Sequence, residues 1–385
     1  MYHFEPLTAF LDNEAENFCI PARSMLIMKD GKEIYRHYAG YADTARTRSV
    51  AGDDLYWIYS ATKVSTCTGA LRLIEEGKLG LDDPVSKYLP KFANLTVKRE
   101  DGSVTPAENV MTVRHLMSMQ GGLDYDMHRG DIDAVIKEKG EDAGTVDIVN
   151  TFPEAPLIFE PGTHFQYSLC HDVLAAVIEV ASGMRYSEYL KKVIFDPLGM
   201  KDTTFHPTEE QLSRVSARYQ YSEESHVSAP VDPNRFQSGI PEKYESGGGG
   251  ILSSLNDYIL LGAALANKGT GLNGYQLLKP ETVELFRTPQ LGEDSLADYH
   301  RDFLQCAGYS YGLGVRVFTD DRNAIAPVGH FGWDGAAGFY LMIDPDTNVS
   351  YVYAQHVMSS TVTFHHIHRQ IRDLAYFCMR EEKLV

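Results

Sequence analysis

The sequence lacks the features that mark several large classes of protein. It carries 35 Lys and Arg against 53 Asp and Glu, a net charge of -18, and no basic cluster that could replace the counterions of nucleic-acid phosphates. No stretch approaches the roughly 20 apolar residues of a membrane span. The N-terminal segment, MYHFEPLTAFLDNEAENF, is acidic and lacks the apolar run of a signal peptide. We therefore expect neither nucleic acid nor membrane as a partner.

Cysteine is scarce as well. The five cysteines are scattered, odd in number and without Cys-x-x-Cys spacing. This pattern argues against a disulfide framework or a zinc site and favours free thiols in a reducing compartment. The glycine run at 247–250 is not followed by the Lys and Ser or Thr of a phosphate loop. We expect a cytoplasmic protein without a metal or a cofactor.

The composition itself is that of a globular protein, with 385 residues, 43% hydrophobic and 23% charged. Strand signals lie near both ends of the chain: a hairpin turning at Asp30-Gly31, and strands at 314–318, 338–343 and 350–354. Between them the periodicity predicts helices and loops, including helices at 112–119, 170–182 and 256–266, and a last helix is predicted at 363–378.

This order of elements predicts two lobes. Residues 1–78 and 291–385 would form one α/β lobe built from both chain ends, and residues 79–290 a mostly helical insertion. The site is expected in the cleft between the lobes.

A candidate nucleophile lies at the start of the helix that follows the first strands. Ser60 and Lys63 form the Ser-x-x-Lys of Ser60-Ala61-Thr62-Lys63. Residues three apart share one helix face, so the amine can reach the hydroxyl. The positive end of a helix and burial both lower the pKa of such a lysine, which lets it act as a base. The motif alone equally fits a serine cap followed by a solvated lysine.

Several segments around this motif resemble the serine β-lactamase-like superfamily. They cover nearly the whole chain in the family's order: Leu55–Pro90, Met111–Leu123, Phe159–Glu179, Phe195–Phe205 and Gly247–Tyr258. The resemblance implies an α+β fold, with an antiparallel β-sheet flanked by helices and a mostly helical inserted domain. It also makes Ser60 the expected nucleophile.

The family's second motif is Tyr-x-Asn, which matches Tyr167-Ser168-Leu169. The resemblance implies that Tyr167 shares the proton relay with Lys63. Leu169 stands where β-lactamases carry an Asn that contacts the substrate, so β-lactam recognition is in doubt. The segment YSLCHDVL instead resembles family VIII carboxylesterases and related transesterases.

The family's third motif, Lys-Thr-Gly or His-x-Gly, has two possible registers here. One begins at His330, and the other comprises Trp333, Asp334 and Gly335. We favour the second, because the family's triplet begins eleven residues before an Asp-Pro turn, which fits Trp333. The backbone N–H of Ala336 would then join that of Ser60 in the oxyanion hole. Trp333 would wall the acyl pocket, and the triplet, Leu169 and His330 are the expected substrate contacts.

The expected activity is that of a serine esterase acting on a small-molecule ester through an acyl-enzyme. No lysine stands at the third motif, so two groups specific to β-lactams are missing while the nucleophile, base and oxyanion donors are kept. Three alternatives stay open: an acyltransferase that passes the acyl group to an alcohol or amine, a β-lactamase or D-amino-acid peptidase, and a non-catalytic binder on the same fold.

Two other patterns are weaker candidates, one for a catalytic serine and one for a metal site. Ser310 lies in a Gly-x-Ser-x-Gly, but a strand follows it where a nucleophile elbow needs a helix. His365, His366 and His368 lie on the last helix without a carboxylate or thiol at ligand spacing. We interpret the three histidines as a solvated helix face.

Overall fold

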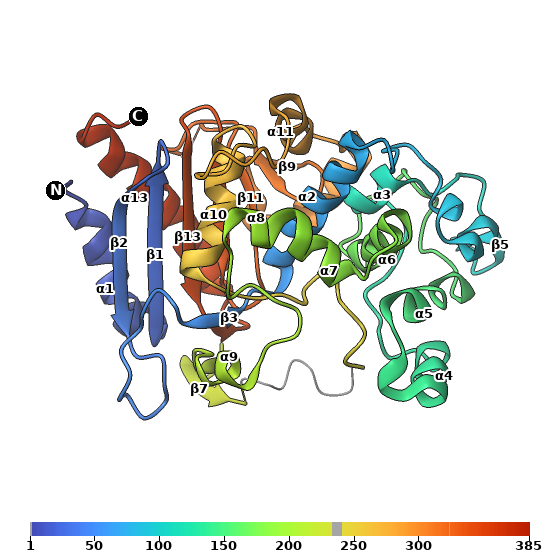
Figure 1. Cartoon of the computed structure of the whole chain (residues 1–385), viewed down its shortest axis with the longest axis horizontal. Helices are drawn as coiled ribbons and strands as arrows, with labels where there is room; N and C mark the ends of the chain where they lie inside the picture. Colours follow the sequence, from blue (N-terminus) through green and yellow to red (C-terminus); the bar gives the residue numbers. More distant parts are fainter. Residues whose placement is uncertain (1, 233–240, 323) are drawn as a thin grey trace.

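A computed structural model describes residues 2–232, 241–322 and 324–385. Within them, an antiparallel sheet runs in the order β2-β1-β13-β12-β11-β10-β9 (Figure 1). Its strands are β1 (Ala22–Lys29), β2 (Lys32–Gly40), β9 (Tyr309–Tyr311), β10 (Arg316–Phe318), β11 (Phe331–Asp334), β12 (Tyr340–Asp344) and β13 (Val349–Gln355). Both ends of the chain thus build one sheet.

The predicted hairpin is confirmed. Asp30 and Gly31 have φ values of 50° and 70°, the left-handed conformation that a tight turn between twisted strands requires. In β1 the side chains alternate between two cores: Met25 and Ile27 pack on one face of the sheet, and Leu26 packs on the other. Because both faces are covered, residues 25–28 in the middle of the strand are all apolar and buried.

Helices cover both faces. On one side, α1 (Glu5–Phe18) packs against α13 (His368–Glu381), which continues a π-helical turn at Thr363–Ile367. On the other, α10 (Leu255–Ala266) packs against β1, β12 and β13. Sequence periodicity predicted α10 and the last helix but not α1. Although α10 falls within the predicted insertion, it packs on the sheet.

The chain between the two sheet-forming ends is largely helical. Helix α2 (Thr62–Glu75) contacts both β11 and α6 (Cys170–Ser182), and α6 ends at Gly183, whose φ is 68°. The remaining helices are α3 (Val113–Met117), α4 (Gly130–Lys139), α5 (Thr145–Val149), α7 (Tyr186–Leu190), α8 (Asp196–Leu198), α9 (Glu209–Ser213), α11 (Pro280–Arg287) and α12 (Glu293–Asp302). None of the helices described is long and apolar enough to cross a membrane.

Short strands also lie in this region, so the prediction of helices and loops alone for residues 79–290 was wrong. They are β4 (Thr96–Lys98), β5 (Val104–Pro106), β6 (Arg218–Ser222), β7 (Val227–Val231) and β8 (Leu252–Ser254). Strand β8 pairs with β3 (Leu55–Trp57), and β14 (Val357–Met358) pairs with β6. The division into two lobes stays a prediction.

Candidate active site

Ser60 lies at a sharp turn between β3 and α2. After β3 the chain forms a 3-10 turn at Tyr59–Ala61 and then enters α2. Tyr59 has a φ of 46°, which is uncommon for a residue with a side chain. Its phenol accepts a hydrogen bond from Arg218 Nη1 at 2.8 Å, which holds the turn. The turn presents Ser60 at the N-terminal end of α2, where it lines a cavity.

Lys63 lies one helical turn further on, as predicted, and reaches the serine. Its Nζ donates to Ser60 Oγ at 3.1 Å and to the Gly248 carbonyl at 2.7 Å. The Lys63 side chain is fully buried, and burial lowers the pKa of the amine. An amine with a lowered pKa is available in neutral form to accept a proton from the hydroxyl.

Tyr167 completes this group. The Lys63 Nζ lies 4.6 Å from the centroid of its ring. The indole N–H of Trp333 donates to the Tyr167 oxygen at 3.2 Å, and the two rings stack with centroids 5.7 Å apart. Burial raises the pKa of Tyr167, against the opposing effect of hydrogen bonds with Ser60 and Trp333. Tyr125 stacks on the phenol ring as well, with centroids 6.0 Å apart.

The third motif meets the nucleophile turn through Gly335, which follows β11. A Cβ on Gly335 would lie 2.1 Å from the Ile58 carbonyl oxygen, so only glycine allows this approach. Ala336 comes next and lines the same cavity as Ser60. The geometry therefore favours the register beginning at Trp333. His330 is fully buried, bonds to the Tyr309 hydroxyl and the Pro327 carbonyl, and has its pKa lowered to about 3 by burial.

The structure does not bring every predicted contact to the cavity. Leu169 lines it, but Trp333 is buried behind it and holds Tyr167 instead of walling the cavity. The Asp334 carboxylate accepts from Arg316 Nη1 at 2.5 Å and bonds to His368 Nδ1 at 3.1 Å. Because adjacent residues of a strand point to opposite faces, Asp334 turns away from the site when Trp333 turns toward Tyr167.

The interpretation of the last helix as solvated is wrong for one of its histidines. His365 and His366 are exposed, but His368 is only 4% exposed and packs against the sheet. His368 is the histidine that faces the sheet, because its ring contacts the rings of Tyr340 in β12 and Tyr353 in β13. Ser310 lies within β9 and not at a strand-to-helix turn.

Asp172 is a buried carboxyl near the amine that the sequence reasoning did not single out. Its Oδ1 accepts from the Tyr244 hydroxyl at 2.8 Å, and burial raises its pKa. Gly248 separates it from Lys63: a Cβ there would lie 2.8 Å from Asp172 Oδ2 and 3.5 Å from Lys63 Nζ. Asp172 is the acidic residue of the YSLCHDVL segment, which was the available signal.

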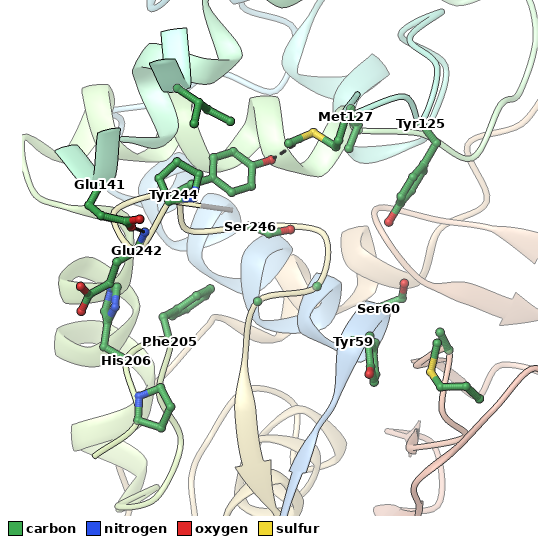
Figure 2. Close-up of a pocket in the computed structure, with 18 of the residues that line it drawn as sticks. Tyr59, Ser60, Tyr125, Met127, Glu141, Phe205, His206, Glu242, Tyr244 and Ser246 are labelled. Atoms are coloured by element: carbon green, nitrogen blue, oxygen red, sulfur yellow. Dashed lines mark hydrogen bonds between the residues drawn. The ribbon is translucent and has the colours of Figure 1, made fainter. Parts of the chain in front are cut away.

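Ser60 lines a cavity with a volume of about 780 Å³. Figure 2 shows Ser60 and Tyr125 at one end and Phe205, His206 and Glu141 toward the other. Most lining side chains are apolar, among them Met127, Ile136, Leu169, Phe205, Leu212 and Met358. The site thus combines a serine hydroxyl bonded to a buried amine with a large apolar space beside it.

Comparisons with known proteins find relatives over most of the chain. The chain is 29% identical to esterase EstB of Burkholderia gladioli, over 83% of this chain and 81% of that protein. It is 27% identical to the lovastatin esterase of Penicillium rubens, covering 77% and 78% of the two chains. Among solved structures, EstCE1, described as a hydrolase with promiscuous acyltransferase activity, superposes with a TM-score of 0.78 at 25% identity, covering 97% and 98% of the two chains.

These matches confirm the predicted resemblance and the α+β fold with its antiparallel sheet flanked by helices. The β-lactamase family model matches residues 10–376, which is nearly the whole chain. The chain therefore belongs to the β-lactamase family.

Proposed function

We propose that this protein is a serine esterase that forms an acyl-enzyme on Ser60. The observation that carries the proposal is the buried Lys63 amine, 3.1 Å from Ser60 Oγ at the mouth of an apolar cavity. The esterase relatives support ester substrates. A binder without catalysis would have no need for a desolvated amine aimed at the hydroxyl.

The proposed reaction has two halves, acylation of Ser60 and hydrolysis of the acyl-enzyme, and the same groups act in both. Ser60 attacks the ester carbonyl while Lys63 takes its proton. The backbone N–H groups of Ser60 and Ala336 stabilise the oxyanion. Tyr167 hands a proton to the leaving alcohol and receives in exchange the proton that Lys63 took from Ser60, so both groups are neutral again when the acyl-enzyme has formed. Water then attacks the acyl-enzyme, with the same groups moving the protons in reverse.

The cavity favours an ester with a bulky apolar group over a β-lactam. Apolar walls stabilise apolar substrate groups by about 25 cal/mol for each Å² removed from water. Leu169 lines this space and offers no amide to a β-lactam side chain. The third motif likewise supplies no lysine to hold a substrate carboxylate.

Acyl transfer is the second candidate. The acyltransferase activity described for EstCE1 and the size of the cavity favour it, since about 780 Å³ can hold an acceptor alcohol beside the acyl group. Acceptor alcohols added to the preformed acyl-enzyme should accelerate its decay and yield the new ester. If no acceptor does so, the protein is a hydrolase only.

The location is proposed to be cytoplasmic. All five cysteines are free thiols, four of them buried, which fits a reducing compartment.

The direct test is covalent labelling with a fluorophosphonate. We expect the label on Ser60, with labelling and aryl-ester hydrolysis lost in Ser60→Ala and reduced at least 100-fold in Lys63→Met, the cost of losing an acid–base group. Ser310→Ala, which alters the other candidate serine, should behave as wild type. An unlabelled protein, or a label on another serine, would refute the proposal. Faster turnover of a chromogenic cephalosporin than of aryl esters would reassign the activity to β-lactam hydrolysis.

A further inference from the structure

His368 joins the last helix to both ends of the turn that carries Ala336. Its Nδ1 bonds to Asp334 Oδ2 at 3.1 Å, and its Nε2 faces the Gly338 carbonyl oxygen at 3.2 Å. Asp334 is the last residue of β11, and Gly338 lies two residues before β12. One side chain therefore spans the whole 335–338 turn.

Both partners of the imidazole ring are hydrogen-bond acceptors. An ionised carboxylate and a backbone carbonyl accept only, so both bonds form together when each ring nitrogen carries a proton. Burial by itself would raise the pKa of Asp334, but Arg316 and His368 hold it at about 2. Asp334 is thus an anion shared by a guanidinium and an imidazole in the interior.

Aromatic rings pack against both the His368 and the Arg316 side chains. Tyr340 stacks on the His368 ring with centroids 4.7 Å apart, and Phe364 meets it edge-on at 5.5 Å. The Arg316 guanidinium lies 4.5 Å from the Tyr340 centroid and 5.7 Å from that of Trp333. The group formed by His368, Asp334 and Arg316 therefore also lies against the ring that holds Tyr167.

Besides the packing of Gly335 against the Ile58 carbonyl and of the buried Ala337, the described residues give the turn few other hydrogen bonds. Gly338 N–H donates to the Gly335 carbonyl at 2.8 Å within the turn, and Gly335 N–H donates at 2.7 Å to the carbonyl of Phe339, the residue that follows the turn. From outside, Val357 N–H donates to the Ala337 carbonyl at 3.0 Å. An oxyanion donor is effective only when it is held in position before charge develops.

We propose that His368 is a positioning residue that fixes the oxyanion turn through Asp334 and the Gly338 carbonyl. The inference rests on the proposed function, because it assigns the held N–H of Ala336 to the oxyanion. His368 touches no substrate, and it acts by holding the end of β11 and the start of the return strand at a fixed separation.

The test compares His368→Leu, which removes both hydrogen bonds, with His368→Asn, which retains a donor near Asp334 but cannot reach Gly338. We expect kcat/KM for an aryl ester to fall about 10- to 100-fold in the Leu variant, less than the 100- to 1000-fold loss of an entire oxyanion donor. The Asn variant should fall between wild type and Leu. The same substitutions at the exposed His365 are the matched controls and should leave activity unchanged.

A transition-state analogue separates positioning from general damage. Phenylboronic acid forms a tetrahedral adduct on the serine, so its inhibition constant should rise by the same factor as kcat/KM falls. A merely structural role would lower the fraction of active sites, counted by fluorophosphonate titration, and leave that constant unchanged. Amide hydrogen exchange of residues 335–338 should also be faster in the variants.

The outcomes are distinct. The inference is overturned if either folded variant shows wild-type kinetics and unchanged amide hydrogen exchange at residues 335–338. If the Leu variant does not fold, the Asn variant alone decides. Failure of the proposed function would instead appear in the wild-type protein, as absence of Ser60 labelling and ester hydrolysis. Even then the exchange measurement tests whether His368 holds the turn.

Discussion

Replacing Gly335 by Ala tests the contact that joins the nucleophile turn to the third motif. The added Cβ would lie 2.1 Å from the Ile58 carbonyl oxygen and 2.9 Å from its carbon. Both neighbours are backbone atoms, so no side-chain rotation can relieve the overlap. The two segments must separate by about 0.9 Å for the oxygen to reach 3.0 Å, the lower limit for such contacts.

The separation would move one oxyanion donor away from the other, because Gly335 directly precedes Ala336 and Ile58 lies two residues before Ser60. A displacement of about 1 Å in a catalytic site can cost about 100-fold in rate. We therefore expect kcat/KM for an aryl ester to fall about 100-fold, equivalent to about 2.7 kcal/mol of transition-state stabilisation.

The assay is steady-state hydrolysis of a short-chain aryl ester, with the rate of fluorophosphonate labelling as a second measure. Gly130→Ala is the matched control, because a Cβ at Gly130 meets nothing within 4 Å. Thermal unfolding of both variants shows whether the fold survives. A folded Gly335→Ala protein with kcat/KM within threefold of wild type would refute the reasoning about this contact.

Three further substitutions test other parts of the structure. Trp333→Phe keeps the ring stack but removes the N–H that holds Tyr167, so kcat should fall about 10-fold, less than for a lost acid–base group; unchanged kcat would show that the bond is dispensable. Phe205→Leu opens the cavity wall and should shift kcat/KM toward longer acyl esters by about 10-fold, measured on an acyl series; no shift would place the acyl group elsewhere. Glu14, whose pKa burial raises to about 8, keeps a proton that the unfolded chain releases above about pH 4.5, so stability falls as the pH rises from 4.5 to 8. Glu14→Gln should remove this pH dependence and be more stable than wild type at pH 8 by up to about 5 kcal/mol. Denaturant unfolding of both proteins at pH 4.5 and pH 8 measures the difference. An equal change of stability with pH in the two proteins would contradict the prediction.

Local patterns predicted those parts of the site that depend on neighbours in sequence. The distance between Lys63 and Ser60 follows from helical spacing, and the helix over residues 170–182 ends at Gly183 because a left-handed residue closes it. The resemblance supplied the order of the three motifs. It could not say which side chain of the third motif faces the site.

The remaining features depend on packing between distant segments. The bond between Asp334 and His368 spans 34 residues, and the approach of Asp172 to Lys63 depends on Gly248 lying between them. His368 lies three and seven residues before the buried Ile371 and Ala375, so helical spacing could have placed it on the buried face of the last helix, unlike the exposed His366. The opposite directions of Trp333 and Asp334 could have been foreseen, since neighbours in a strand alternate between faces.

The environments of Lys63 and Tyr167 assign their roles in the proposed reaction. Burial lowers the pKa of Lys63 and raises that of Tyr167, so desolvation favours the neutral form of both groups. A neutral amine can accept a proton, whereas a neutral phenol can only donate one or pass one on. A tyrosinate base would need a nearby fixed cation, and burial works against an ammonium at Lys63. Burial also raises the pKa of Asp172, which reduces the negative charge available to stabilise that ammonium. In the proposed reaction the proton of Ser60 would therefore go first to Lys63, and Lys63 would pass it to Tyr167 as Tyr167 protonates the leaving alcohol.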